Sequence, residues 1–390
     1  MMNYQLQYKI LAQDFTQQKT SIDIHELTTC IANYTFESEF SLAQAKTCLY
    51  TKNNIDADLL RSKTWGNDHF FYSIFLPEKF QKYNKAILLL HGLNERSWEK
   101  YLVWASYLAQ NTNQPVILFP LAFHMNRSPI EWNDPRTMMK LSEQRKTYSP
   151  GLNNSSYLNA AISTRIENNP EQFFLSGMQS FIDVVRFIRS IKQGNHPNFE
   201  EDTLINICSY SIGAFLSQLL VMDNPFGLFD STKLFLFCGG ATFDQMNGIS
   251  RFIIDSKAFA RLKSLANVEY FAQIKKYFDE WDIPEIRYTW APLYSMTFLK
   301  EGAEMREHKL NEMGKRIYAI GLEKDKVVPP KAIISTLKGI KNNLPSHVEI
   351  LDFPYPYTHE NPFPIKNESF QNEVDHQFKV IFDKVATFLK

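Results

Sequence analysis

Short apolar runs alternate along the chain with longer segments in which apolar residues recur every three or four positions. The short runs are typical of strands buried in a parallel sheet, and the longer segments are typical of amphipathic helices. We predict helices at Trp98–Ala109, Glu171–Lys192 and Phe370–Leu389, and strands at Phe70–Leu76, Ala86–Leu90, Val116–Phe119, Leu204–Cys208, Lys233–Cys238, Arg316–Gly321 and His347–Phe353. This alternation predicts an α/β fold, with a mainly parallel sheet that carries helices on both faces.

Two long segments interrupt the alternation. Residues 121–170 read as an insertion above the strand ends, with Phe123, Met125 and Trp132 available to line a pocket. Residues 241–312 read as a mostly helical, aromatic-rich insertion, which we expect to be a lid; the alternative is a set of core helices that never move. Residues 1–64 are expected to be an N-terminal extension that packs on the core or lies over the site, and residues 65–390 are expected to form the main domain.

The most informative motif lies between a predicted strand and a predicted helix. Ser209-Tyr-Ser211-Ile-Gly213 follows the strand Leu204–Cys208 and opens a helix. In a nucleophile elbow, a strand is followed by a tight turn with a central serine and then by a buried helix. The elbow needs small residues two positions before and two positions after the serine. Here the first of these is Ser209 instead of glycine. Ser211 is therefore a candidate nucleophile, and the alternative is a helix-capping serine.

A second segment suits the stabilisation of negative charge. The strand Ala86–Leu90 ends at His91-Gly-Leu93, where a turn could point the backbone N–H of Leu93 into the site. Acyl transfer builds charge on an oxygen, which two N–H donors can stabilise. The second donor would be the N–H of Ile212, at the start of the helix. For His91 a structural role is favoured over that of a base.

Two later loops supply an acid and a base. After the strand that ends at Gly321, a loop carries Glu323 and Asp325, and we expect Asp325 to orient an imidazole. A solvated loop carboxylate is the alternative for Asp325, and Asp244, after the preceding strand, is a rival acid. The base is expected to be His359, on a proline-rich loop after the last strand. The other candidates fit less well, because His91 is favoured as structural, His347 begins a strand and His376 lies off an apolar helix face.

The chain order Ser211, Asp325, His359 is the order used by α/β-hydrolases. Over roughly residues 65–390 the chain resembles bacterial proteins of the α/β-hydrolase superfamily, and it is most similar to an uncharacterised family with an HGLNERSW-type segment, here His91–Trp98. The resemblance implies a three-layer α/β-hydrolase fold and a hydrolytic serine mechanism that uses these three residues. It implies no substrate, and Ser209 departs from the superfamily pattern.

Composition narrows the remaining possibilities. The 390 residues have a formal net charge of +0 and no long basic run, so nucleic acid is not expected as a partner. No segment of about 20 apolar residues suggests a membrane span, and the N-terminal residues do not resemble a signal peptide. The cysteines show no metal-ligand spacing. Cys208 and Cys238 lie in apolar runs, and a reducing cytoplasm is the simplest fit.

The sequence therefore predicts a serine hydrolase that acts on an ester or related small-molecule acyl compound, with no metal or organic cofactor. The sequence does not separate esterase, thioesterase, lipase and peptidase. Two alternatives stay open, a non-catalytic ligand-binding protein on the same scaffold and a non-hydrolytic enzyme such as a lyase. Oligomeric state cannot be predicted from the sequence.

Overall fold

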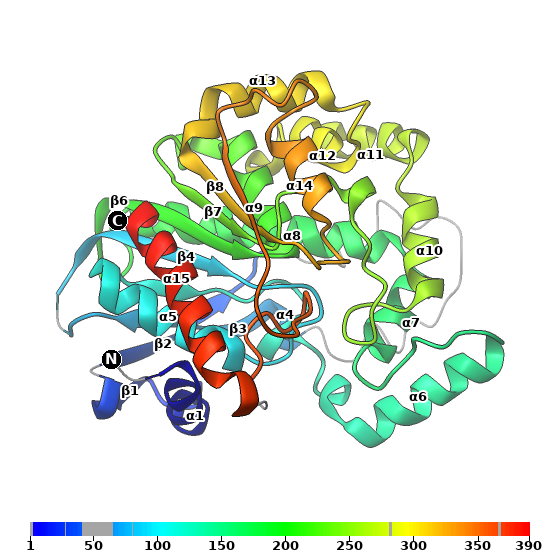
Figure 1. Cartoon of the computed structure of the whole chain (residues 1–390). Coiled ribbons are helices and arrows are strands. Elements are labelled where there is room, and N and C mark those ends of the chain that lie inside the picture. Colours follow the sequence, from blue (N-terminus) through cyan, green and yellow to red (C-terminus); the bar gives the residue numbers. More distant parts are fainter. Residues whose placement is uncertain (1–2, 28, 41–64, 80, 281–282, 366–367) are drawn as a thin grey trace.

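One twisted sheet organises the molecule (Figure 1). The computed structural model describes residues 3–27, 29–40, 65–79, 81–280, 283–365 and 368–390. Within them the sheet has nine strands in the order β1-β2-β3-β5-β4-β6-β7-β8-β9, and β5, β4, β6, β7, β8 and β9 run parallel to one another. The strands are β1 (Ser21–Ile24), β2 (Thr29–Glu37), β3 (His69–Leu76), β4 (Tyr83–Leu90), β5 (Val116–Leu118), β6 (Phe199–Tyr210), β7 (Leu234–Phe237), β8 (Ile317–Leu322) and β9 (His347–Leu351).

Helices cover both faces of this sheet. One face carries α1 (Tyr4–Asp14), α5 (Glu99–Thr112) and α15 (Gln371–Leu389), and the other carries α8 (Glu171–Lys192), α9 (Ile212–Asp223) and α14 (Pro330–Leu337). Strand β4 shows why its sequence is a continuous apolar run. Its alternate residues enter two separate cores, Leu88 and Leu90 on the α8 side and Ile87 and Leu89 on the α5 side. The prediction of a three-layer α/β-hydrolase fold with a mainly parallel sheet is confirmed.

The N-terminal region contributes more to the core than the sequence suggested. We expected residues 1–64 to form an extension that packs on the core or lies over the site. In the described part of this region, β1 and β2 also continue the sheet beyond β3 in antiparallel pairing. The pairing of β2 with β3 runs from Cys30 opposite Leu76 to Glu37 opposite His69. An edge hairpin of this kind is specified by its partner strand, which lies far along the chain, rather than by a local apolar run. Residues 41–64 lie outside the described part.

Both predicted insertions contain helices. Residues 121–170 include α6 (Pro135–Tyr148) and α7 (Ala160–Asn168), and residues 241–312 include α10 (Ser256–Leu265), α11 (Val268–Glu280), α12 (Trp290–Thr297) and α13 (Ala303–Met313). Helix α10 packs on α7, so the two insertions contact each other. In Figure 1, α10 to α13 are gathered along the top and the right side of the sheet. The remaining helices of the described residues are α4 (Trp65–Asp68) and 3₁₀ turns at His25–Leu27, Met125–Arg127, Ile130–Asn133, Pro225–Gly227, Phe243–Gln245, Pro284–Ile286, Gly314–Arg316 and Glu368–Phe370.

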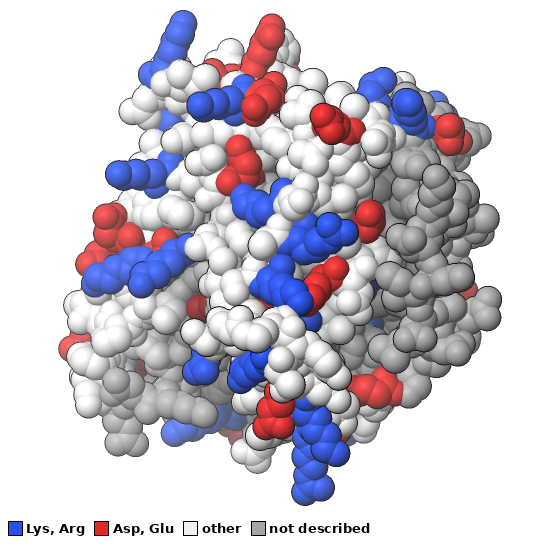
Figure 2. All heavy atoms as spheres, turned by 90° about the vertical axis from the view of Figure 1, so that its right-hand side faces the viewer, with Lys and Arg blue, Asp and Glu red and all other residues white. Residues whose placement is uncertain are grey.

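The surface carries charges of both signs. On the face shown in Figure 2, Lys and Arg side chains are interspersed with Asp and Glu side chains. None of the described helices is both long enough and apolar enough to cross a membrane.

Candidate active site

Ser211 lies in a strained turn between β6 and α9. Its backbone has φ 57° and ψ −119°, a combination that side-chain-bearing residues adopt only when the surrounding structure enforces it. Gly213 shows what enforces it, because a Cβ at this position would lie 2.7 Å from the carbonyl oxygen of His91 and 2.8 Å from that of Leu90. The helix therefore approaches the end of β4 at a distance that only glycine allows, and this packing holds the turn.

Ser209, which stands where the superfamily pattern has glycine, is accommodated without an unpaired hydroxyl. Its side chain is buried, with Oγ 2.8 Å from Oγ of Ser217 and 3.2 Å from the carbonyl oxygen of Phe235. A buried hydroxyl with such partners carries no desolvation penalty of the kind that an orphaned one does. The departure from the pattern is thus compatible with the elbow geometry.

The structure brings Ser211, His359 and Asp325 into one hydrogen-bonded chain. Nε2 of His359 lies 2.7 Å from Oγ of Ser211, and Nδ1 of His359 lies 2.7 Å from Oδ2 of Asp325. The carboxylate can only accept, so Nδ1 carries the proton and Nε2 accepts from the serine hydroxyl. All three side chains are buried. The imidazole is thereby held in the tautomer that can take a proton from Ser211.

Asp325 is oriented by the turn that follows it. Its Oδ1 accepts the backbone N–H groups of Val327 at 2.8 Å and Val328 at 2.9 Å, which leaves Oδ2 facing His359. The rival acid, Asp244, is engaged elsewhere: it accepts from the hydroxyl of Thr242 and from the backbone N–H of Leu299. Glu323 is exposed.

The loop that carries His359 is anchored by residues that sequence reasoning did not single out. The Tyr210 hydroxyl donates to the carbonyl oxygen of His359, and the two rings stack at 5.4 Å with an angle of 21°. Lys100 donates to the carbonyl oxygen of Glu360 at 3.1 Å, with its ammonium 4.5 Å from the Tyr210 ring centre. Tyr210 stands inside the elbow motif, and this position was the available signal. The contact that Lys100 makes with this loop forms only in the folded protein, so no local sequence pattern indicates it.

Leu93 and Ile212, which line one cavity together with Ser211, have backbone N–H groups that are unengaged within the described residues. Neither the N–H of Leu93 nor that of Ile212 donates to another described residue. Ile212 is the first residue of α9, where backbone donors have no partner within the helix and the helix dipole is positive. The turn that carries Leu93 is tied down by the N–H of Gly92, which donates to the Tyr101 hydroxyl at 2.9 Å, and this hydroxyl donates to Glu95 at 3.0 Å.

The other histidines have different surroundings. His91 is fully buried: its Nδ1 donates to the carbonyl oxygen of Gly92 at 2.8 Å, and its Nε2 accepts the N–H of Leu121 at 3.0 Å. Burial lowers the pKa of His91 to about 3, so the ring is a neutral bridge between two turns. His347 is exposed and pairs with Glu349, and His376 is exposed.

Comparison with known proteins gives a family and weak structural likenesses. The chain belongs to DUF6051, a family of unknown function. The family model covers residues 2–390. No curated protein matches the sequence. Among solved structures, carboxyl esterase 2 of the mycorrhizal fungus Tuber melanosporum is 10% identical, with a TM-score of 0.45 over 87% of this chain and 90% of that chain. The hyperthermophilic esterase of the archaeon Pyrobaculum calidifontis is 10% identical, with a TM-score of 0.44 over 99% and 90% of the two chains.

Ser211 of this DUF6051 chain opens into an apolar cavity of about 410 Å³, counting the part open to solvent. Much of its wall comes from the second insertion, and Leu93 and Ile212 border it. Within the described residues its lining is Leu93, Phe173, Ser211, Ile212, Phe243, Met246, Gly248, Ile253, Ile254, Phe259, Leu262, Val327 and Val328. Of the three pocket candidates from the first insertion, Phe123 and Trp132 line a neighbouring larger cavity, whereas Met125 is buried in the core on the α5 side.

One cluster of metal-binding side-chain types lies at the same place. Potential ligand atoms of Cys238, Asp325 and His359 all lie within 4.8 Å of one another. Asp325 and His359 are already paired with each other, however, and burial, reinforced by the Asp325 carboxylate, raises the pKa of the Cys238 thiol well above its ordinary value. A thiol must lose its proton to bind a metal. The chemistry of this set therefore fits proton transfer better than metal binding.

Proposed function

We propose that this DUF6051 protein is a serine hydrolase that cleaves esters or related acyl compounds at Ser211. The observation that carries the proposal is the continuous chain from Ser211 Oγ through His359 to Asp325, with 2.7 Å at both hydrogen bonds. This hydrogen-bonded chain begins at a serine with a strained backbone, and two residues with unengaged N–H groups line the same cavity as this serine. Strain of this kind is concentrated at functional sites.

Each group has a defined role in the proposed reaction. As Oγ of Ser211 attacks the acyl carbon, its proton passes to Nε2 of His359, and the imidazolium then gives this proton to the leaving oxygen. A water molecule repeats the sequence on the acyl-enzyme and releases the acid. Asp325 orients His359 and balances its positive charge. The N–H groups of Leu93 and Ile212 would stabilise the oxyanion.

The surroundings of Ser211 also support a hydrolase with an apolar substrate. The cavity at Ser211 is lined almost wholly by aliphatic and aromatic side chains, which favour an apolar acyl or alkyl group and exclude water from the reacting atoms. The helical insertion 241–312 supplies several of these walls, and we propose that it acts as a lid over the site. The non-catalytic alternative would need the same cavity but would leave the Ser211–His359 hydrogen bond without a purpose.

Hydrolysis of p-nitrophenyl acetate and p-nitrophenyl hexanoate tests the proposal. Ser211→Ala should reduce kcat by on the order of 10⁴–10⁶, whereas the control Ser209→Ala, two residues away, should keep activity within about tenfold because it removes only structural hydrogen bonds. Equal activity of Ser211→Ala and the unmodified protein would refute the assignment of Ser211 as the nucleophile. Absence of any turnover by a folded protein that binds these esters would favour the non-catalytic alternative.

A further inference from the structure

A second, larger cavity lies next to the one that holds Ser211. It has about 970 Å³ of empty space, counting the part open to solvent, and it lies between the first insertion, α8 and α9. The two cavities share Leu93, Phe173 and Ile212 as lining residues. A group bound in the larger cavity would therefore lie beside Leu93 and Ile212, whose backbone N–H groups are the proposed oxyanion donors. Concave sites with mostly apolar walls and a few polar groups commonly hold small organic ligands.

Two buried polar atoms in the largely apolar wall lack a hydrogen-bond partner. Nε2 of His124 and Nε2 of Gln172 have no hydrogen-bond partner, and both residues line the larger cavity. The side chains are not simply exposed to bulk water, because His124 is 8% exposed and Gln172 is 1% exposed. Buried polar atoms without partners are rare in folded proteins, since they lose the hydrogen bonds that water would give. A ligand in the cavity could supply the missing partners.

The second polar atom of each side chain is already hydrogen-bonded, and this bond determines whether the unpaired Nε2 is a donor or an acceptor. Nδ1 of His124 lies 2.8 Å from the carbonyl oxygen of Ala122, which only accepts, so Nδ1 carries the proton and Nε2 is an acceptor. Burial lowers the pKa of His124 to about 3, which keeps the ring neutral. Oε1 of Gln172 accepts from Arg165 at 2.8 Å, so the unpaired Nε2 is a donor. The wall thus offers one acceptor and one donor.

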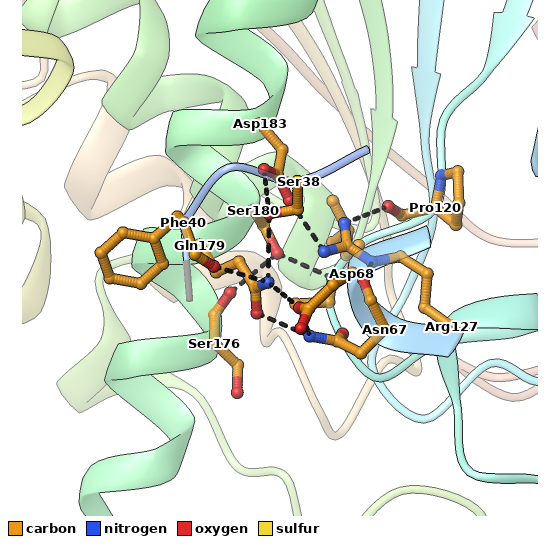
Figure 3. Close-up of polar contacts among 12 residues, drawn as sticks. Ser38, Phe40, Asn67, Asp68, Pro120, Arg127, Ser176, Gln179, Ser180 and Asp183 are labelled. Atoms are coloured by element: carbon orange, nitrogen blue, oxygen red, sulfur yellow. Dashed lines mark hydrogen bonds and ion pairs between the residues drawn. The ribbon is translucent and has the colours of Figure 1, made fainter. Parts of the chain in front are cut away.

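The turn that presents His124 is held by a buried polar network. Figure 3 shows Asn67, Arg127 and Asp183, which belong to this network. The N–H of Phe123 donates to Asn67 at 2.9 Å, and Phe123 itself has a φ of 64°. Arg127, at the end of the turn, is fully buried and pairs with Asp183 at 2.8 Å. Because the turn is fixed on both sides of His124, its acceptor is preorganised, which reduces the entropic cost of binding.

The same turn is coupled to Gln172. The Arg165 guanidinium, which donates to Gln172, stacks on the Phe123 ring at 3.5 Å. The acceptor and the donor are therefore parts of one contiguous wall. We propose that this cavity binds an apolar organic group that carries a hydroxyl, which donates to Nε2 of His124 and accepts from Nε2 of Gln172. That this group belongs to an ester cleaved at Ser211 rests on the proposed hydrolase function; the binding itself does not.

Calorimetric binding of phenol and toluene tests the proposal without turnover. The two ligands have nearly the same shape, and phenol carries the hydroxyl. The quantity to compare is the Kd of toluene divided by the Kd of phenol. This ratio should fall at least about fivefold in His124→Phe and in Gln172→Met, because each variant removes one hydrogen-bonding atom. In the control Met178→Leu, which changes an apolar part of the same wall, the ratio should stay within about twofold.

The two polar variants are independent, so a failure of one to fold leaves the other as the test. An unchanged ratio in a folded His124→Phe or Gln172→Met protein would overturn the proposal, as would failure of the unmodified protein to bind phenol at millimolar concentration. Neither result bears on Ser211, whose role is tested by ester hydrolysis. A hydrolase that turns over esters but shows no such ratio change would retain the proposed function and lose the hydroxyl specificity.

Discussion

Replacing Asp325 by asparagine should nearly abolish hydrolysis while leaving the fold intact. In the native protein Oδ1 of Asp325 accepts the N–H groups of Val327 and Val328, and Oδ2 faces Nδ1 of His359 at 2.7 Å. An asparagine keeps the first two hydrogen bonds only if its oxygen faces the two valines. Its NH₂ group must then face His359.

The consequence follows from the tautomer of the imidazole. Facing an NH₂ donor, Nδ1 of His359 must present its lone pair, so the proton moves to Nε2. Nε2 then donates to Ser211 and can no longer take its proton. The imidazolium would also lose its counter-charge. We therefore expect kcat to fall by roughly 10⁴, with little change in the thermal midpoint because the turn keeps its backbone hydrogen bonds.

The assay is hydrolysis of p-nitrophenyl esters, paired with a thermal melt. Asp244→Asn is the matched control, because Asp244 also accepts two hydrogen bonds near the site, whereas among the described residues the His359 ring is hydrogen-bonded to Asp325 and Ser211. The control should retain activity. If Asp325→Asn keeps near-full activity while Asp244→Asn loses it, the acid follows the earlier strand and the reasoning about the Asp325 turn is wrong.

Three further predictions address the packing around the elbow and the buried histidines. Gly213→Ala should lower both the thermal midpoint and the rate of ester hydrolysis, because its Cβ would lie 2.7 Å from the carbonyl oxygen of His91; a variant as stable and active as the unmodified protein would contradict this close packing. Ser209→Gly should keep activity within about tenfold and lower the free energy of unfolding by about 1 kcal/mol, measured by urea unfolding, because the hydrogen bond to Ser217 is lost. Burial lowers the pKa of both His91 and His124 from 6.5 to about 3, so the unfolded chain binds more protons between these values, and the stabilisation present above pH 6.5 should be lost as the pH falls towards 3. A urea midpoint that does not change between about pH 7 and about pH 4 would argue against neutral buried rings.

The local patterns predicted the central elements well. Helix α8 has the predicted bounds Glu171–Lys192, because a long segment with one apolar face admits few alternatives. The approach of Ser211, Asp325 and His359 also follows from local signals, since each residue lies in a turn or loop that follows the carboxyl end of a strand, and parallel strands place these ends at one edge.

Features that depend on distant partners were not predictable in the same way. Strand β2 was missed because its pairing with β3 joins Cys30 to Leu76, across residues whose local pattern is mixed. The wall that carries His124 and Gln172 depends on an Arg165–Phe123 contact between different elements. Such contacts form only when the fold brings the elements together, so no residue spacing in the sequence predicts them.

Mapping the site of covalent modification by a fluorophosphonate tests the central claim most directly. The compound reacts with a serine whose hydroxyl is activated by a neighbouring base. Treated protein should gain one adduct per chain, and peptide mass spectrometry should place this adduct on Ser211. The reaction should be lost in Ser211→Ala and strongly slowed in His359→Ala, with the fold checked by circular dichroism. An adduct on another residue, or no adduct on a folded protein, would contradict the account.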